Sequence, residues 1–183
     1  SKLATFHCTL GRWKPQENKN APAFGRHAIP MIWDYPEMNP FAGAGGDFTG
    51  VVAGAALVLE NSPATPQGVS RQCDARNVER TNVVVSCDPP YYDNIGYADL
   101  SDFFYFWLRQ NLASINLNWV STITTPKDAE LISTPYRHSG SREAARNFFE
   151  EGLARCFTSF RSAQHEAYPL SIYYAFKQSE NDV

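Results

Sequence analysis

Several features that would assign a protein to a broad class at once are absent from this sequence. Its four cysteines form no C-x-x-C pair, which argues against zinc-ribbon and redox motifs and favours free thiols in a reducing compartment. The four histidines follow no metal-ligand spacing, so no metal site is expected. No apolar run approaches the roughly 20 residues of a membrane span, and the N-terminus lacks a signal-peptide core. We therefore expect a cytoplasmic protein without a membrane segment.

An excess of positive charge is also lacking. The formal net charge of -3 argues against a protein held on nucleic acid mainly by an overall basic surface, although a basic groove can coexist with an acidic remainder. The chain is 43% apolar and 14% aromatic, which is enough to bury a core, and its 183 residues suit a single domain, 1–183. It begins without Met and ends directly after a strand-like run, so we expect a piece of a longer protein.

Hydrophobic patterning predicts an α/β fold. Strands are expected at residues 29–33, 69–74, 83–85 and 170–176, and helices at residues 51–59, 100–112 and 141–165. Residues 1–30 show no clear period and are expected to form an irregular lead-in, whereas residues 69–178 form the core. The order of strands and helices favours a mostly parallel sheet with flanking helices. Asp99 or Ser101 is the expected N-cap of the helix at 100–112.

The clearest chemical signal is Asp88-Pro89-Pro90-Tyr91, which follows three consecutive valines of a buried-strand pattern. In open α/β sheets, ligands bind beyond the carboxyl ends of the strands, where this motif lies. Each proline fixes φ near about -65° and lacks an N–H group. The Asp88 carboxylate and the Pro89 carbonyl therefore form a rigid wall of acceptors, which matches the two N–H donors of an exocyclic amino group. Accepting both donors would direct the nitrogen lone pair toward an electrophilic methyl group.

A base inside a duplex cannot reach such a wall and must first be flipped out, at a cost of a few kcal/mol. Stacking on an aromatic ring such as that of Tyr91 returns roughly 1–3 kcal/mol. Tyr92, Tyr97, Phe103 and Phe104 are further stacking candidates nearby in the sequence. The alternative is that the two prolines only form a turn and the aspartate caps the next element. The position after a valine-rich strand and before an aromatic helix favours the functional interpretation.

A longer stretch of sequence carries a family resemblance. Residues 87–112 (CDPPYYDNIGYADLSDFFYFWLRQNL) closely resemble a family of large bacterial and archaeal adenine-specific DNA methylases, which have an N-terminal domain of formerly unknown function and often a zinc ribbon. Three further segments resemble the same family in the same order: residues 24–41 (FGRHAIPMIWDYPEMNPF), 125–138 (TPKDAELISTPYRH) and 168–180 (YPLSIYYAFKQSE). The resemblance implies part of a Rossmann-like class I methyltransferase core, with S-adenosylmethionine as cofactor. It also implies catalytic roles for Asp88, Pro89, Pro90 and Tyr91.

Two segments look like parts that hold this cofactor. Asp74, in Gln-Cys-Asp-Ala, resembles the acidic residue that lies near the adenosine in such enzymes. Residues 39–45 (NPFAGAG) imitate an Asp-Pro-Phe-x-Gly-x-Gly loop that binds the methionine part, which would make Phe41, Gly43 and Gly45 cofactor contacts. The first residue is Asn where Asp is expected, and in full-length relatives the cofactor loop lies further upstream. An ordinary glycine turn is therefore the alternative.

Other polar and aromatic residues near the motif are candidates for nucleic-acid contact. They are Tyr92, Asn94, Tyr97, Lys127, Arg137 and His138. Basic side chains on loops commonly position a nucleic-acid backbone, and a solvated loop is the alternative for residues 122–140. Asp93, Asp99 and Asp102 are explained more simply by helix capping and turns than by a metal site.

The leading hypothesis is the catalytic region of a DNA methyltransferase. It would transfer a methyl group from S-adenosylmethionine to the exocyclic amino group of a flipped base, adenine N6. Its partners would be DNA and the remainder of a larger methylase chain. Positioning supplies the catalysis, and no covalent enzyme intermediate is needed. Two alternatives stay open: methylation of cytosine N4 or of RNA, and an inactive fragment that only binds or packs against a partner.

Overall fold

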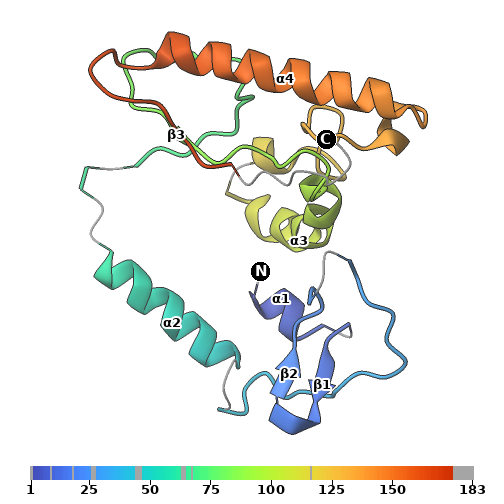
Figure 1. Cartoon of the computed structure of the whole chain (residues 1–183). Helices are drawn as coiled ribbons and strands as arrows, with labels where there is room; N and C mark the ends of the chain where they lie inside the picture. The colour runs from blue at the N-terminus through green and yellow to red at the C-terminus, as the bar shows by residue number, and fades with distance from the viewer. Residues whose placement is uncertain are drawn as a thin grey trace. The chain divides into compact units, whose positions relative to one another are not determined.

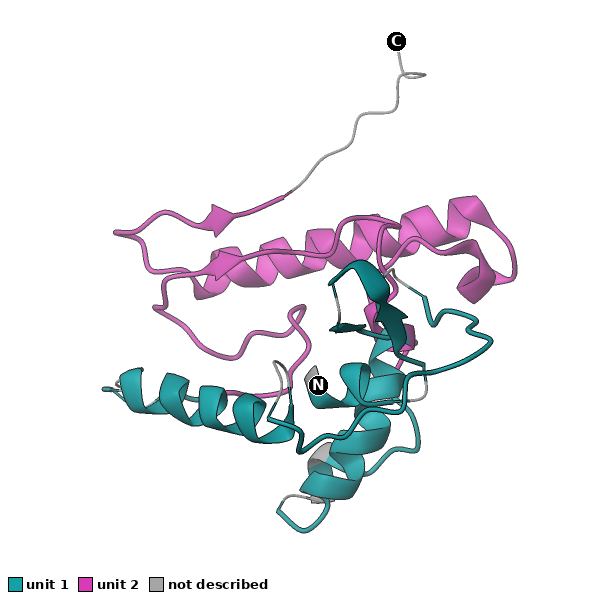
Figure 2. Cartoon of the chain, turned by 90° about the horizontal axis from the view of Figure 1, so that it is seen from below, with its two compact units in different colours: residues 1–69, 100–125 teal, residues 70–99, 126–183 magenta. Residues whose placement is uncertain are grey.

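The computed structural model describes residues 2–8, 10–17, 19–25, 28–43, 47–62, 65–66, 68–115 and 117–174. The chain divides into two compact units (Figure 2). Unit 1 contains residues 1–69 and 100–125, and unit 2 contains residues 70–99 and 126–183. The prediction of a single domain stays a prediction. Of the helices described, none is long and apolar enough to cross a membrane.

Unit 1 combines short N-terminal elements with two longer helices (Figure 1). Its elements are α1 (Lys2–Phe6), β1 (Arg12–Lys14), the 3-10 helix η1 (Pro15–Glu17), β2 (Lys19–Ala21), α2 (Phe48–Asn61), α3 (Tyr97–Leu112) from residue 100 onward, and the 3-10 helix η2 (Leu117–Val120). Strands β1 and β2 pair antiparallel, with Trp13 opposite Asn20. Residues 1–30 thus contain a helix and a hairpin, where the sequence predicted only irregular structure.

The α3 part of unit 1 packs through aromatic rings. The ring centroids of Phe103 and Phe104 lie 5.0 and 5.4 Å from that of Phe24. The segment after α3 is tied back to the helix, since Asp102 accepts hydrogen bonds from the backbone N–H of Thr125 at 2.9 Å and from its hydroxyl at 2.6 Å. Phe103 and Phe104, which the sequence offered as stacking partners for a base, therefore serve in packing within unit 1.

Helix α2 begins at an aspartate cap. The Asp47 carboxylate accepts the Gly50 N–H at 2.7 Å and the Thr49 hydroxyl at 2.9 Å, which satisfies donors that the first turn leaves open. The predicted helix at 51–59 is confirmed and extends beyond that range at both ends. The structure buries none of its side chains, and Leu59 is 77% exposed. The cap and an alanine-rich composition therefore support this helix within the structure, with no help from a core.

Unit 2 is built around a short parallel pair of strands. Its elements are β3 (Ser86–Cys87), the first residues of α3, the 3-10 helix η3 (Pro135–His138), α4 (Arg142–Ala163) and β4 (Ser171–Ile172). Strands β3 and β4 pair in parallel. The ladder begins before β3, because the N–H groups of Ser171 and Tyr173 donate to the carbonyls of Val85 and Cys87 at 3.1 and 2.9 Å. The strands predicted at 83–85 and 170–176 thus correspond to this parallel pair, although the formal strands are shorter and β3 starts at Ser86. Residues 175 and 176 of the second predicted strand lie outside the described residues.

Helix α4 covers this pair and confirms the helix predicted at 141–165 (Figure 1). It starts at Ser141, whose hydroxyl oxygen accepts the Ala144 N–H at 3.1 Å. Its buried residues recur at helical spacing: Ala145, Phe149, Gly152, Cys156 and Ala163. The phenylalanines of α4 are only partly buried. Phe149 is buried, whereas Phe148, Phe157 and Phe160 are half-buried, and the other buried positions of the helix are the small residues Ala145, Gly152, Cys156 and Ala163.

Three local predictions are wrong. Residues 29–33 and 69–74 were expected to be strands, but both are loops, since neither finds a partner for ladder hydrogen bonds. Asp99 and Ser101 do not cap α3, because the helix already begins at Tyr97. The larger parallel sheet of a Rossmann-like methyltransferase core stays a prediction. The described residues contain two two-stranded sheets, one antiparallel and one parallel.

Candidate base-binding site

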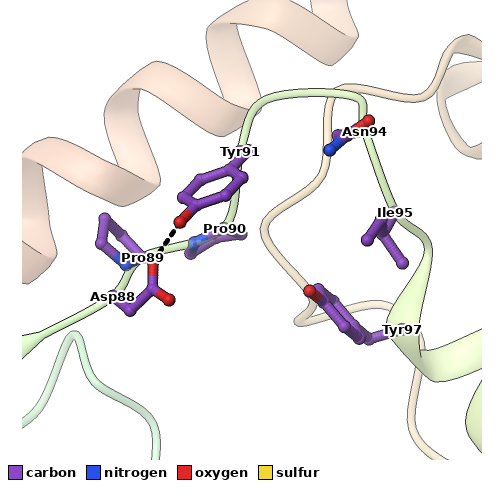
Figure 3. A pocket seen from close by; sticks show the side chains of 7 residues that line it. All are labelled: Asp88, Pro89, Pro90, Tyr91, Asn94, Ile95 and Tyr97. Carbon is purple, nitrogen blue, oxygen red and sulfur yellow. Dashed lines mark hydrogen bonds between the residues drawn. The ribbon is translucent and has the colours of Figure 1, made fainter. Parts of the chain in front are cut away.

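The Asp-Pro-Pro-Tyr motif follows directly at the carboxyl end of β3 and forms one wall of a pocket. The pocket has a volume of about 280 Å³. Its lining residues are Asp88, Pro89, Pro90, Tyr91, Asn94, Ile95 and Tyr97, all in unit 2 (Figure 3). This volume is close to the lower end of the usual range for ligand sites, about 300 Å³, so it suits one small ring system. Six of the residues predicted for the site thus lie around one hollow.

Asp88 and Tyr91 are joined to each other within this wall of the pocket. The Tyr91 hydroxyl donates to Asp88 Oδ1 at 2.6 Å, as the dashed line in Figure 3 shows. This hydrogen bond, together with burial and the negative charge of Asp88, raises the pKa of the Tyr91 phenol above its ordinary value. A carboxylate has about four acceptor positions, so Asp88 keeps capacity for a further donor. The Tyr91 ring is also supported edge-on by Tyr174, with a centroid distance of 5.4 Å.

The chain turns sharply after Tyr91. Tyr92 adopts a left-handed conformation with φ of 49°, and the Asn94 N–H donates to the Tyr91 carbonyl at 2.9 Å. Such a conformation is unfavourable for a bulky side chain and persists only where packing fixes it. Here the Ser133 N–H donates to the Tyr92 carbonyl at 2.9 Å, and the Tyr92 ring meets Phe149 edge-to-face at 5.3 Å. Tyr92 therefore anchors the turn and is not among the residues that line the pocket.

Behind the pocket, Arg137 is the centre of an ion-pair network. Its guanidinium donates to Glu130 Oε2 at 2.7 Å, to Asp99 Oδ2 at 2.8 Å and to the Lys127 carbonyl at 3.0 Å. The Tyr136 hydroxyl donates to the same Asp99 oxygen at 2.5 Å. These hydrogen bonds, first from Tyr136 and then from Arg137, lower the pKa of Asp99. The Arg137 side chain is only 13% exposed, and its positive charge is compensated by Glu130 and Asp99.

The network reaches the start of α3. Glu130 Oε1 accepts the Ala98 N–H at 3.0 Å and so caps the first turn of α3. The adjacent Tyr97 lines the pocket and is 57% exposed. Arg137 and Glu130 thus fix the start of α3 and, with it, the position of Tyr97 in the pocket wall. His138, the other residue predicted for nucleic-acid contact in η3, places its ring 4.9 Å from that of Phe148.

In the glycine loop of unit 1, the amide groups of Phe41 and Gly43 are occupied locally. The Phe41 N–H donates to Asn39 Oδ1 at 2.9 Å, and the Gly43 N–H donates to Asp47 Oδ2 at 3.1 Å. Gly43 has φ of 70°, a conformation that glycine adopts most readily. Gly45 lies outside the described residues. This arrangement is that of a turn leading into the α2 cap, so it favours the ordinary glycine turn. Cofactor contact by Phe41 and Gly43 stays a prediction.

The carboxylate of Asp74 is likewise engaged within the chain. Arg76 Nε lies 2.9 Å from each carboxylate oxygen, and Arg76 Nη2 lies 2.5 Å from Oδ2. These hydrogen bonds lower the pKa of Asp74. Asp74 belongs to a groove beside α4 and is not a lining residue of the Asp88 pocket. Among the described residues, the amides of Phe41 and Gly43 and the carboxylate of Asp74 are thus engaged within the chain.

Sequence reasoning missed three residues of the site. Ile95 lines the pocket, Tyr174 supports the Tyr91 ring, and Glu130 caps α3. The first two lie within segments that resemble the methylase family, which was the available signal. Glu130 also lies in such a segment, residues 125–138, but nothing there indicated a capping role, because its partner is 32 residues away in the chain.

Comparison of the chain with protein-family models, curated proteins and solved structures gave no match. Among the residues that the structure describes, no group of three or more His, Cys, Asp or Glu side chains is arranged to hold a metal ion. The function must therefore be argued from the pocket itself.

Proposed function

We propose that unit 2 carries the target-base pocket of a DNA methyltransferase that acts on an exocyclic amino group, adenine N6. The observation that carries the proposal is the pocket at the carboxyl end of β3, where an acceptor wall and aromatic rings converge. The family resemblance of residues 87–112 supports the same reaction. The methyl donor it implies is S-adenosylmethionine.

The wall suits an amino group that donates two hydrogen bonds. Asp88 is exposed and accepts from Tyr91 through one oxygen, so its remaining lone pairs are available to a ligand. The Pro89 carbonyl is the second acceptor, on a backbone that two prolines hold rigid. A base amino group that donates to both is fixed in orientation. Its nitrogen lone pair then points out of the base plane, which favours attack on a methyl group.

Aromatic rings supply the binding energy that keeps a base outside the duplex. Tyr91 and Tyr97 both line the pocket (Figure 3). Tyr174 supports the ring of Tyr91 edge-on. The turn at Tyr92 fixes Tyr91 at one end of residues 88–97, and the Arg137 network fixes Tyr97 at the other end. Preorganised rings lose little side-chain entropy when the base enters, so more of the stacking energy is retained on binding.

Of the residues predicted to hold the methyl donor, Phe41 and Gly43 have their amides and Asp74 has its carboxylate bonded within the chain, and Gly45 lies outside the described residues. The proposal therefore assigns no residue to the methyl donor. The roles assigned to this chain accordingly concern the acceptor base alone. They are binding, stacking and orientation of its amino group.

The direct test is base methylation. The protein is incubated with unmethylated genomic DNA and S-adenosylmethionine carrying a deuterated methyl group, and the digested nucleosides are analysed by mass spectrometry. We expect labelled N6-methyladenine, and we expect Asp88→Ala to remove it. Asp93→Ala is the matched control, because it deletes an exposed carboxylate from the same turn that does not line the pocket. Near-normal methylation by Asp88→Ala would contradict the proposal.

A second measurement separates the pocket from the reaction. Ligand-observed NMR with deoxyadenosine needs no cofactor, and we expect its signal to depend on Asp88 and Tyr91 but not on Asp93. Binding without methylation would favour the alternative of a binding module. Label on cytosine N4, or on RNA offered in parallel, would favour the other alternative.

A further inference from the structure

A second hollow lies in unit 2, at the amino end of the strand that carries the motif. It has a volume of about 650 Å³ and lies between residues 74–81 and the C-terminal half of α4. The residues that matter for its chemistry are Asp74, Arg76, Arg80, Arg155 and Ser159. We call it the arginine groove. None of its residues lines the Asp88 pocket.

Positive charge is concentrated in the arginine groove. Three arginines and one aspartate line it, which gives a formal charge of +3 - 1 = +2 in a chain whose net charge is -3. Asp74 holds Arg76 through Nε and Nη2, so that arginine is fixed and its charge is compensated. Arg80 and Arg155 form no ion pair within the part of the chain that the structure describes, and both are exposed. Two guanidinium groups are thus available to an anion.

A neutral donor lines the same groove. The Val78 N–H donates to the Ser159 hydroxyl oxygen at 2.9 Å, which leaves the hydroxyl hydrogen for another acceptor. The hydroxyls of Thr158 and Ser162, on the same helix, instead donate to backbone carbonyls of α4. Guanidinium groups with a hydroxyl donor are the usual set for a phosphate, because the planar guanidinium matches its oxygens in pairs.

The groove and the Asp88 pocket lie at opposite ends of one extended segment. The Val83 N–H donates to the carbonyl of Ala163, which lines the groove, at 3.1 Å. From Val83 to Asp88 the chain advances five residues, a span of about 16 Å at 3.3 Å per residue. Duplex DNA rises about 3.4 Å per base pair, so the same span corresponds to about five base pairs.

From this placement we infer that the arginine groove binds the sugar–phosphate backbone of the DNA duplex whose flipped base enters the Asp88 pocket, about five base pairs away. The inference rests on the proposed function for the identity of the polyanion. Arg80 and Arg155 are the phosphate ligands, and Ser159 adds a neutral hydrogen bond. Contacts of this kind set the register of a duplex without reading its sequence.

The test is duplex binding by the whole protein, measured by fluorescence anisotropy with a labelled duplex of about 20 base pairs at salt concentrations from about 50 to 200 mM. The double variant Arg80→Gln/Arg155→Gln removes two phosphate contacts. We expect the slope of log affinity against log salt to become shallower by about 1.8, which is twice about 0.9. At about 0.1 M salt, the affinity then falls on the order of 10- to 60-fold.

The matched control is Arg142→Gln/Arg146→Gln, which removes two exposed charges from the other end of α4. It should change the affinity far less. An equal loss in both variants, or no loss in either, would overturn the inference. A further arm offers inorganic tripolyphosphate. If Arg80→Gln/Arg155→Gln weakens the binding of tripolyphosphate but leaves the affinity for the duplex unchanged, the inference is also overturned, because the groove would then be a site for a small anion.

Failure of this inference can be told apart from failure of the proposed function. If the inference holds, the groove variant raises the KM for DNA and leaves kcat near that of the wild type, whereas Asp88→Ala abolishes methylation with little change in duplex affinity. A wild-type protein that does not methylate but shows the groove-dependent affinity would refute the enzyme and support the groove. A groove variant with a normal KM and normal duplex affinity would refute the groove alone.

Discussion

Replacing Arg137 by glutamine tests whether the network behind the pocket holds unit 2 together. Arg137 donates to Glu130 at 2.7 Å, to Asp99 at 2.8 Å and to the Lys127 carbonyl at 3.0 Å. The Glu130 side chain is 16% exposed and that of Asp99 is 42% exposed. The substitution therefore leaves one mostly buried carboxylate without its cation and one that water still solvates.

The expected loss of stability follows from these exposures. Breaking a fully buried ion pair by removing one partner costs about 3–5 kcal/mol. The pair with Glu130 is close to that case, whereas the pair with Asp99 is near the surface, where such pairs contribute about 0–1 kcal/mol. We expect Arg137→Gln to lower the free energy of unfolding by about 2–3 kcal/mol, toward the lower end because Glu130 keeps the Ala98 N–H.

Urea unfolding, followed by circular dichroism, measures this loss. The double variant Arg137→Gln/Glu130→Gln should recover part of it, because it also removes the uncompensated charge. Arg142→Gln on the exposed start of α4 is the control and should stay within about 0.5 kcal/mol of the wild type. An Arg137→Gln variant as stable as this control would refute the reasoning, since the network would then be a surface feature only.

Two further predictions concern single residues of the two units. Gly54→Ala should stabilise α2 by about 1 kcal/mol, because no atom lies near the added methyl group, whereas Gly152→Ala should destabilise the protein by about 1–3 kcal/mol, because the buried methyl collides with Leu131. Thermal unfolding should give a higher Tm for Gly54→Ala and a lower Tm for Gly152→Ala than for the wild type. Changes in Tm of the same sign would contradict the packing described for α4. In the Asp88 pocket, the hydrogen bond to Asp88 raises the pKa of Tyr91 in the folded protein. The stability that this bond contributes is fully present at pH values below the ordinary tyrosine pKa. It is lost as the pH rises through the raised pKa of the folded state. A spectrophotometric titration should therefore show a late-ionising tyrosine that is absent from Tyr91→Phe, and identical titration of the remaining tyrosines would be the control.

Asp88 and Tyr91 could be singled out from the sequence because their signal is local. Three valines followed by Asp-Pro-Pro-Tyr predict a strand end, a rigid acceptor wall and an aromatic face from adjacent residues, and the pocket contains all three. Helix α4 was equally accessible, because Ser141 and the helical spacing of apolar residues specify its start and its length. Features of this kind depend on contacts within about one turn of helix or one strand.

The cap of α3 and the role of Arg137 depend on residues that are distant in the chain. The sequence suggested Asp99 or Ser101 as the cap, but Glu130 supplies it, and the helix therefore starts earlier, at Tyr97. Arg137 on a polar loop was predicted to contact nucleic acid, yet it is enclosed by two carboxylates. A charged side chain looks the same in a sequence whether a partner folds over it or not.

The sequence by itself determined the acceptor wall of this protein, its aromatic surroundings and the helices that follow their own periodicity, since each of these depends on neighbouring residues. Tertiary structure decided which polar groups remain available to a ligand. It placed Arg76 on Asp74, left Arg80 and Arg155 open, and directed the Gly43 amide to Asp47, the cap of α2. The physical reason is that a hydrogen-bonding group has a limited number of positions, and only the folded chain shows which of them other residues already occupy.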